Sequence, residues 1–164
     1  MALRYIRNSE DSVLRKKAEP VSRFASGLFR LLDDMAETIV EADGAGLAAP
    51  QVGISKRIIV VRDEDNNIIE LINPVILTSK GIEEDVEGCL SFPGLYGEVS
   101  RAGNIKVTGL DRNGKEFRLD AEGYLARVIQ HEIDHLEGVL FVDRASHILT
   151  PEEVERLREQ QQNN

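Results

Sequence analysis

The segment Gln130–Gly138 constrains the fold and chemistry of this chain more than any other part of the sequence. It places His131 and His135 four positions apart, with Glu132 directly after the first histidine. On an α-helix four residues turn through about 400°, so both imidazoles point to the same side, roughly 6 Å apart along the axis. Two such imidazoles can bind one metal ion, and the adjacent carboxylate can act on a water there. A solvated helix face is the competing interpretation, but two of the chain's three histidines lie here, so we predict a metal site.

Composition and charge narrow the class of protein. The 164 residues are expected to form one domain, 1–164, of ordinary globular composition, with 41% hydrophobic and 30% charged residues. The net charge of −9 argues against a general binder of nucleic acid or of anionic membranes. No apolar run approaches the ~18 residues that span a bilayer, and the start of the chain has no signal-peptide pattern. With Cys89 as the single cysteine, these features predict a cytoplasmic protein without a disulfide framework.

The apolar periodicity predicts an α+β domain with a mostly antiparallel sheet. A helix is expected over 25–41, with a buried face that includes Val40. The expected strands cover 57–61, 68–76, 105–110 and 115–119, the last two joined by an Asn-Gly turn. The helix that carries the two histidines follows, and a short C-terminal helix is expected over 151–158.

A catalytic metal site usually has three protein ligands and one open position, so a third ligand is needed. The metzincin pattern would place a histidine where the chain has Phe141, so that pattern fails. His147 has no special setting and is expected to be an ordinary surface histidine. A thermolysin-like site would use a glutamate of the C-terminal helix. The available residues are typical of a solvated helix face: Glu152, Glu153 and Glu155.

The remaining candidate for the third ligand is Cys89. The competing interpretation is that Cys89 is an ordinary buried free cysteine, which packs as a small hydrophobic residue. It lies between Gly88 and the turn sequence Ser91–Gly94, outside any regular apolar face. Because Gly88 has no side chain, its backbone can approach a bound ion or substrate closely. Spacing alone leaves both Cys89 and a C-terminal glutamate open as the third ligand.

Three motifs taken together resemble those of the peptide deformylase family. Gly44–Gln51, Glu87–Ser91 and Gln130–His135 match the family's motifs in order and in spacing. A single HExxH is a modest signal, whereas the three together are highly specific. The resemblance covers nearly the whole chain and is to the compact bacterial form. It implies antiparallel strands packed around a central metal-binding helix, and an enzyme that removes the formyl group of N-formylmethionyl peptides and releases formate.

The resemblance also implies a role for each motif residue. The metal would be held by Cys89, His131 and His135. The resemblance implies Fe²⁺, with Ni²⁺, Co²⁺ or Zn²⁺ as possible substitutes. Glu132 would act as general base and then as general acid. The Leu90 backbone N–H and the Gln51 side-chain amide would stabilise the oxyanion.

Substrate contacts are implied on two sides of the site. An extended substrate is expected to pair, as in strand addition, with the backbone of Gly44, Ala45 and Gly46, although a helix end and a tight turn explain these residues more simply. The methionine pocket would be lined by Tyr124, Arg127 and Val128. The Arg127 stem is expected to cover apolar surface while its charged head reaches water. Glu87 and Arg101 resemble a pair that braces the metal loop, and Tyr96 stands where some members of the family have an arginine.

Three functions compete on this sequence: a deformylase, a small zinc endopeptidase with a glutamate ligand, and a structural metal-binding module. A structural site normally has four protein ligands, and only three are placed here. The endopeptidase would leave Cys89 and Gln51 without a role. The expected partners are the formylated peptide and, transiently, the ribosome, with no membrane and no specific nucleic acid. Residues 151–164 hold four glutamates against two arginines, so any ribosome contact is expected from basic N-terminal residues instead, namely Arg15, Lys16, Lys17 and Arg23.

Overall fold

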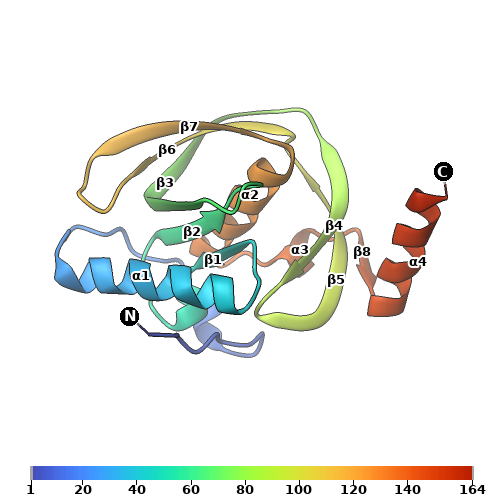
Figure 1. Ribbon diagram of the computed structural model, residues 1–164, viewed down its shortest axis with the longest axis horizontal. Coiled ribbons are helices and arrows are strands. Elements are labelled where there is room, and N and C mark those ends of the chain that lie inside the picture. Colours follow the sequence, from blue (N-terminus) through green and yellow to red (C-terminus); the bar gives the residue numbers. More distant parts are fainter. Residues whose placement is uncertain (1, 164) are drawn as a thin grey trace.

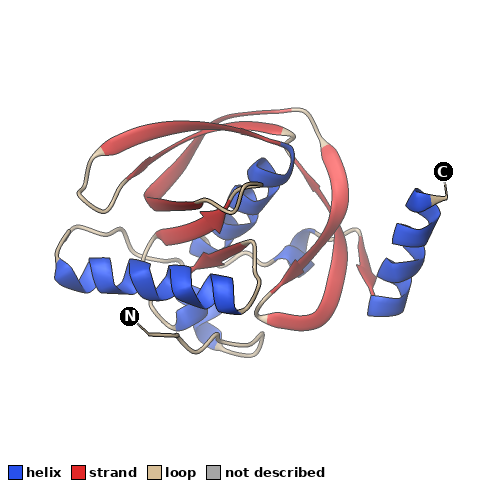
Figure 2. Cartoon of the chain, in the orientation of Figure 1, coloured by secondary structure: helices blue, strands red, loops and turns tan. Residues whose placement is uncertain are grey.

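The computed structural model describes residues 2–163. The first half of the chain contains η1 (Ser12–Arg15), α1 (Ser26–Glu41), β1 (Gly46–Ala48), η2 (Ala49–Val52), β2 (Ile58–Arg62) and β3 (Ile68–Lys80). The second half contains β4 (Glu83–Cys89), β5 (Phe92–Arg101), β6 (Asn104–Leu110), β7 (Glu116–Glu122), α2 (Gly123–Leu136), α3 (Phe141–Arg144), β8 (His147–Leu149) and α4 (Pro151–Gln162). Figure 1 labels these elements, and Figure 2 colours them by type.

The strands form two antiparallel sheets. One has five strands in the order β1-β2-β3-β6-β7, and the other has three in the order β4-β5-β8. The helix α2 lies at the centre of the molecule and contacts β1, β2, β6 and β7 (Figure 1). The predicted α+β class, with antiparallel strands around a central helix, is confirmed.

The strand β2 explains how the larger sheet holds a helix on each face. Successive side chains of a strand point to opposite faces. Ile59 and Val61 pack in the cluster that contains the apolar residues of α2, whereas Ile58 and Val60 pack in the cluster that contains the apolar face of α1. Burial on both faces explains why 58–61 is an uninterrupted apolar run.

Most predicted elements are present, with differences at their edges. The strand β3 continues beyond the expected interruption, because Asn73 adopts a left-handed φ of 52° and the register with β6 shifts between Ile72 and Val75. Val40 is 55% exposed, so its predicted place in the buried face of α1 was wrong. The last helix runs to Gln162 rather than ending at Arg158. Within residues 2–163, no helix combines the length and apolar character needed to cross a bilayer.

The strands β4 and β5 were not predicted from the sequence. Residues 83–87 of β4 are mostly acidic, and only Glu87 in this strand is buried. Strands with so few buried apolar positions have no clear alternation to detect. These two strands nevertheless pair with each other, and the end of β4 places Cys89 next to α2.

Candidate active site

The three predicted metal ligands converge. One ligand atom each of Cys89, His131 and His135 lies within 4.8 Å of the others. Cys89 is the last residue of β4, and its Sγ is 3.5 Å from His135 Nε2 on α2. The C-terminal glutamates are not part of this cluster, and His147 is an exposed residue of β8. The tertiary structure therefore selects Cys89 as the third ligand candidate.

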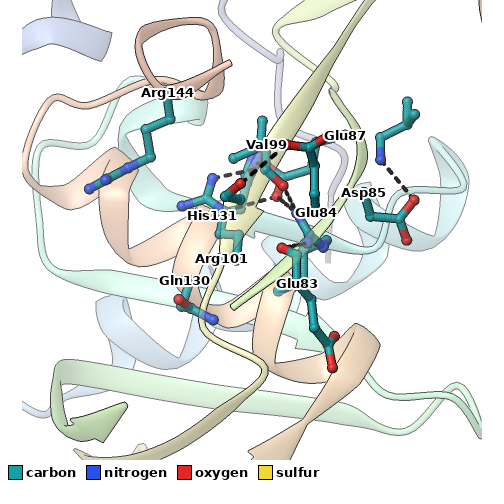
Figure 3. A network of polar contacts seen from close by, with 12 residues as sticks. Glu83, Glu84, Asp85, Glu87, Val99, Arg101, Gln130, His131 and Arg144 are labelled. Atoms are coloured by element: carbon teal, nitrogen blue, oxygen red, sulfur yellow. Dashed lines mark hydrogen bonds and ion pairs between the residues drawn. The ribbon is translucent and has the colours of Figure 1, made fainter. Parts of the chain in front are cut away.

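Glu87 orients the first histidine. His131 Nδ1 is 2.9 Å from Glu87 Oε1, so Nδ1–H donates to the carboxylate and leaves Nε2 as the nitrogen available to a metal (Figure 3). Arg101 donates to both oxygens of Glu87, from Nε at 2.8 Å and from Nη2 at 2.9 Å. Burial acts to raise the pKa of Glu87, but the hydrogen bonds from Arg101 and His131 outweigh it and hold the pKa well below its usual value. The predicted Glu87–Arg101 pair is present.

The donor set fits a metal ion. Burial holds the pKa of His135 well below its usual value, so this imidazole is neutral. A neutral imidazole is the form that binds metal. Within residues 2–163, His135 Nδ1 and Glu132 Oε1 are buried without a hydrogen-bond partner. One sulfur and two imidazoles, beside an unpaired carboxylate oxygen, suit a transition metal with a reactive position next to it.

Glu132 lies under β1. The residue is 4% exposed, and burial raises its pKa to about 7, although the nearby charge of His131 lowers it. A Cβ built on Gly46 would be 2.6 Å from Glu132 Oε2, so only glycine leaves room for this carboxylate. The requirement for glycine at position 46 therefore comes from the packing of Glu132 and not from a turn alone.

Gln51 is held with its amide directed at the cluster. Its Oε1 accepts from the Ala48 N–H at 2.9 Å, which fixes the rotamer. Its Nε2 donates to Ser91 Oγ at 3.1 Å and lies 3.5 Å from Cys89 Sγ. The lone polar residue of this apolar segment thus has partners and faces the candidate metal site.

A cavity of about 820 Å³ lies beside Cys89, His131 and Glu132. It is lined by every residue predicted to bind substrate, namely Gly44, Ala45, Gly46, Gly88, Tyr124, Arg127 and Val128, together with Cys89, Leu90, His131 and Glu132. The strands β1 and β4 are the terminal strands of their sheets, and both line this cavity. A peptide lying between them has two strand edges to pair with.

The comparisons with known proteins agree with this geometry. Residues 3–150 match the family described as polypeptide deformylase. The chain is 53% identical to the peptide deformylase of Caldicellulosiruptor bescii, over 96% of this chain and 95% of that protein. The chain belongs to the polypeptide deformylase family.

Solved deformylase structures share the fold. The crystal structure of the Thermotoga maritima peptide deformylase is 46% identical, with a TM-score of 0.86, and covers 88% of this chain and 99% of that chain. The Met-Ala-Ser-bound class I type b peptide deformylase of Acinetobacter baumannii is 37% identical, with a TM-score of 0.81, over 87% of this chain and 98% of that chain. As a deformylase, the chain removes the formyl group from the N-terminal formylmethionine of newly synthesised proteins. The endopeptidase alternative is not favoured.

Two features of this deformylase site departed from the sequence-based predictions. The Arg127 head does not reach water, because its guanidinium is buried against Glu87 and two backbone carbonyls. Residues of α4 also line the cavity, and no local pattern pointed to them: Val154, Leu157, Arg158 and Gln161. Figure 1 shows α4 at the outer side of β5 and β8. Tyr96, singled out as a departure from the family, lies over Gly88, with ring atoms 3.0 and 3.1 Å from where a Cβ of Gly88 would be.

Proposed function

We propose that Cys89, His131 and His135 hold the catalytic metal of this deformylase and that Glu132 moves the proton in formyl hydrolysis. The observation that supports this most strongly is the unpaired, buried Oε1 of Glu132 in the described part of the chain. Glu132 lines the same cavity as Cys89 and His131, and the ligand atoms of these two residues lie within 4.8 Å of that of His135. We propose Fe²⁺ as the resident ion, since sulfur with two imidazoles suits ferrous iron as well as zinc. Ni²⁺ and Co²⁺ are proposed as competent substitutes and Zn²⁺ as a poorer one. When bound, the metal supplies Lewis-acid chemistry that activates water and polarises the formyl group.

Glu132 is placed to act twice. As general base it takes the proton of the attacking water, and as general acid it delivers this proton to the departing amine, so that formate and a free N-terminal methionine result. Its burial excludes bulk water from the carboxylate. The absence of a side chain at Gly46 leaves the space that this carboxylate occupies against β1.

Stabilisation of the oxyanion is assigned to Gln51 and Leu90. The carbonyl oxygen of the formyl group gains negative charge during attack, and donors that are already oriented stabilise it without reorganisation. Gln51 meets this requirement, because its rotamer is held by the Ala48 N–H. The Leu90 backbone N–H directly follows the cysteine ligand and is proposed as the second donor.

The substrate is proposed to be an N-formylmethionyl peptide in extended form. Its backbone would pair with Gly44, Ala45 and Gly46 on one side, where β1 is the edge of its sheet, and approach Gly88 on the other. The methionine side chain would enter the part of the cavity lined by Tyr124, Arg127 and Val128. The Met-Ala-Ser bound to the Acinetobacter baumannii relative makes formyl-Met-Ala-Ser a suitable probe.

We propose that residues 1–164 form one deformylase domain that works in the cytoplasm and meets nascent chains at the ribosome. The acidic α4 would be repelled by ribosomal RNA. Contact is proposed for the basic residues near η1. Arg15 is already bound to Asp143, and Lys17 lies 3.7 Å from Glu137, which leaves Lys16 and Arg23 as the better candidates.

The test is formate release from formyl-Met-Ala-Ser by protein purified without air, together with metal analysis of the same sample. Glu132→Ala is expected to retain the metal and to lose activity by at least about 10²-fold, the lower range for acid–base catalysis. Near-normal formate release by this variant would remove Glu132 from the mechanism. Cys89→Ala is expected to lose both metal and activity, whereas an enzyme with a C-terminal glutamate ligand would retain both.

A further inference from the structure

The Arg127 side chain connects α2 to both β4 and β5. It is 9% exposed, and its guanidinium makes three hydrogen bonds. Nη1 donates to Glu87 Oε2 at 2.6 Å and to the Val99 carbonyl at 2.8 Å, and Nη2 donates to the Glu83 carbonyl at 2.8 Å. A single side chain of α2 therefore binds the backbone of both strands and the one buried carboxylate of β4.

Arg127 is linked to the candidate metal ligands through Glu87. Glu87 accepts from His131 Nδ1 through its other oxygen, Oε1. Cys89 follows Glu87 by two residues on the same strand. The candidate ligands thus come from two elements, α2 and β4, and their convergence depends on how closely these elements are held together.

Arg127 also lines the same cavity as Tyr124 and Val128, on the side where the methionine is proposed to bind. Because its guanidinium is bound to β4 and β5, we infer that its aliphatic stem is the part that faces the cavity. The polar head faces β4 and β5, whereas the aliphatic carbons are available to a substrate side chain.

We propose that Arg127 is a positioning residue with two separable roles, and this inference rests on the metal site and substrate pocket proposed above. Its guanidinium holds β4 and Glu87 against α2, so that Cys89 and His131 keep their spacing. Its aliphatic stem forms part of the wall of the methionine pocket. Head and stem can be removed separately by substitution.

Charge and geometry predict opposite effects of removing the head. Arg127 brings a positive charge near a cation site, so its loss would tighten metal binding if electrostatics dominated. Without the head, however, two carbonyls and Glu87 Oε2 lose a donor, and the strands must shift or admit water. Loss of such a supporting contact typically weakens metal binding by about 10–100-fold. We expect geometry to dominate, because this one side chain donates to two backbone carbonyls and to Glu87 Oε2, although Glu87 Oε2 also accepts from Arg101 Nε.

The experiment compares Arg127→Met, Arg127→Lys and Arg127→Ala in full-length protein loaded with Ni²⁺. The readouts are the rate of Ni²⁺ loss to a chelator and the KM for formyl-Met-Ala-Ser. Arg127→Met keeps an unbranched stem, so Ni²⁺ loss should be about 10–100-fold faster while KM stays within about 3-fold of wild type. Arg127→Ala should lose Ni²⁺ as quickly and also raise KM by about 10-fold, since the pocket wall is gone. Arg127→Lys keeps the charge but not the three bonds, so its Ni²⁺ loss should also be faster than wild type.

Arg112→Met is the matched control. This substitution removes a guanidinium that binds Glu70 and Asp33, and it should change neither Ni²⁺ loss nor KM. If Arg127→Met retains Ni²⁺ as long as wild type or longer, the positioning role is wrong. If its KM rises as much as that of Arg127→Ala, the role of the stem is wrong. A wild-type protein that holds Ni²⁺ but releases no formate would instead count against the proposed function, and the rates of Ni²⁺ loss would remain interpretable.

Discussion

Gly46 and Glu132 occupy complementary space across the active site. A Cβ on Gly46 would lie 2.6 Å from Glu132 Oε2 and 2.8 Å from its Cγ. Gly46 belongs to β1 and Glu132 to α2, so the requirement for glycine is imposed by a residue distant in the sequence. Because Glu132 is buried, its carboxylate cannot move away into solvent.

This relationship predicts the effect of Gly46→Ala. The added methyl group should displace Glu132 and reduce formate release by about 10²-fold or more while the metal is retained. In the Glu132→Ala background the same substitution should cost little further activity, because the two changes act on one group. Gly27→Ala is the control, since no atom lies within 4 Å of its Cβ position. Full additivity of Gly46→Ala and Glu132→Ala in kcat/KM would contradict the proposed displacement.

Gln51→Leu is predicted to separate catalysis from metal binding. The substitution keeps the approximate size but removes the amide, so kcat should fall by about 10²–10³-fold with the metal still bound. Ser91→Ala removes only the hydroxyl to which Nε2 donates and should have a much smaller effect. Metal analysis alongside kcat is the measurement. Metal loss without a separate catalytic defect would make Gln51 a structural residue.

The proposed identity of the metal predicts the response to air. Activity of the iron form should fall on exposure to oxygen, whereas activity of the nickel form should be retained under the same conditions. Both forms are prepared from the same apoprotein, and formate release is followed over time. A zinc form as active as the anaerobic iron form would show that the assignment of iron is wrong for this chain.

Asp34 predicts a pH-dependent contribution to stability. The Ala2 N–H donates to its carboxylate at 2.8 Å, and this hydrogen bond, with that from Arg4, outweighs burial and holds the pKa of Asp34 below its usual 3.8. A lowered pKa in the folded state means that the stabilisation is complete above the unfolded pKa and is lost as pH falls through the folded value. The difference in unfolding free energy between wild type and Asp34→Asn should therefore shrink below about pH 4. Urea unfolding from pH 3 to 6 measures this difference in unfolding free energy. A difference that is constant over this range would contradict the stabilising role of the bonds from Ala2 and Arg4 to Asp34.

Charge placement predicts how the protein meets the ribosome. Co-sedimentation at low salt is compared for the full chain, for a deletion of 159–164 and for a charge reversal at Lys16 and Arg23. The reversal should weaken binding, and binding to the full chain should fall steeply with salt. The deletion leaves Val154 and Leu157 in place, so a folding defect should not mimic the result. If only the deletion abolished binding, the contact would be made by α4 and not by the basic N-terminal residues.

Local sequence patterns determined several elements of this protein. The apolar steps of α1, the alternation and Asn-Gly turn of the β6–β7 hairpin, and the spacing of His131 and His135 are each encoded within a few residues. Such patterns suffice because helix and strand periodicity depends on neighbours along the chain. The order and spacing of three short motifs were then enough to indicate the family.

Only the tertiary structure decided which distant residues meet. The polar strand β4 carries no clear alternation, yet its pairing with β5 places Cys89 beside the histidines and Glu87 against His131. The same packing directs the head of Arg127 into protein, where the sequence favoured water. These contacts depend on strand pairing and close packing between segments far apart in the chain, and no local pattern records them.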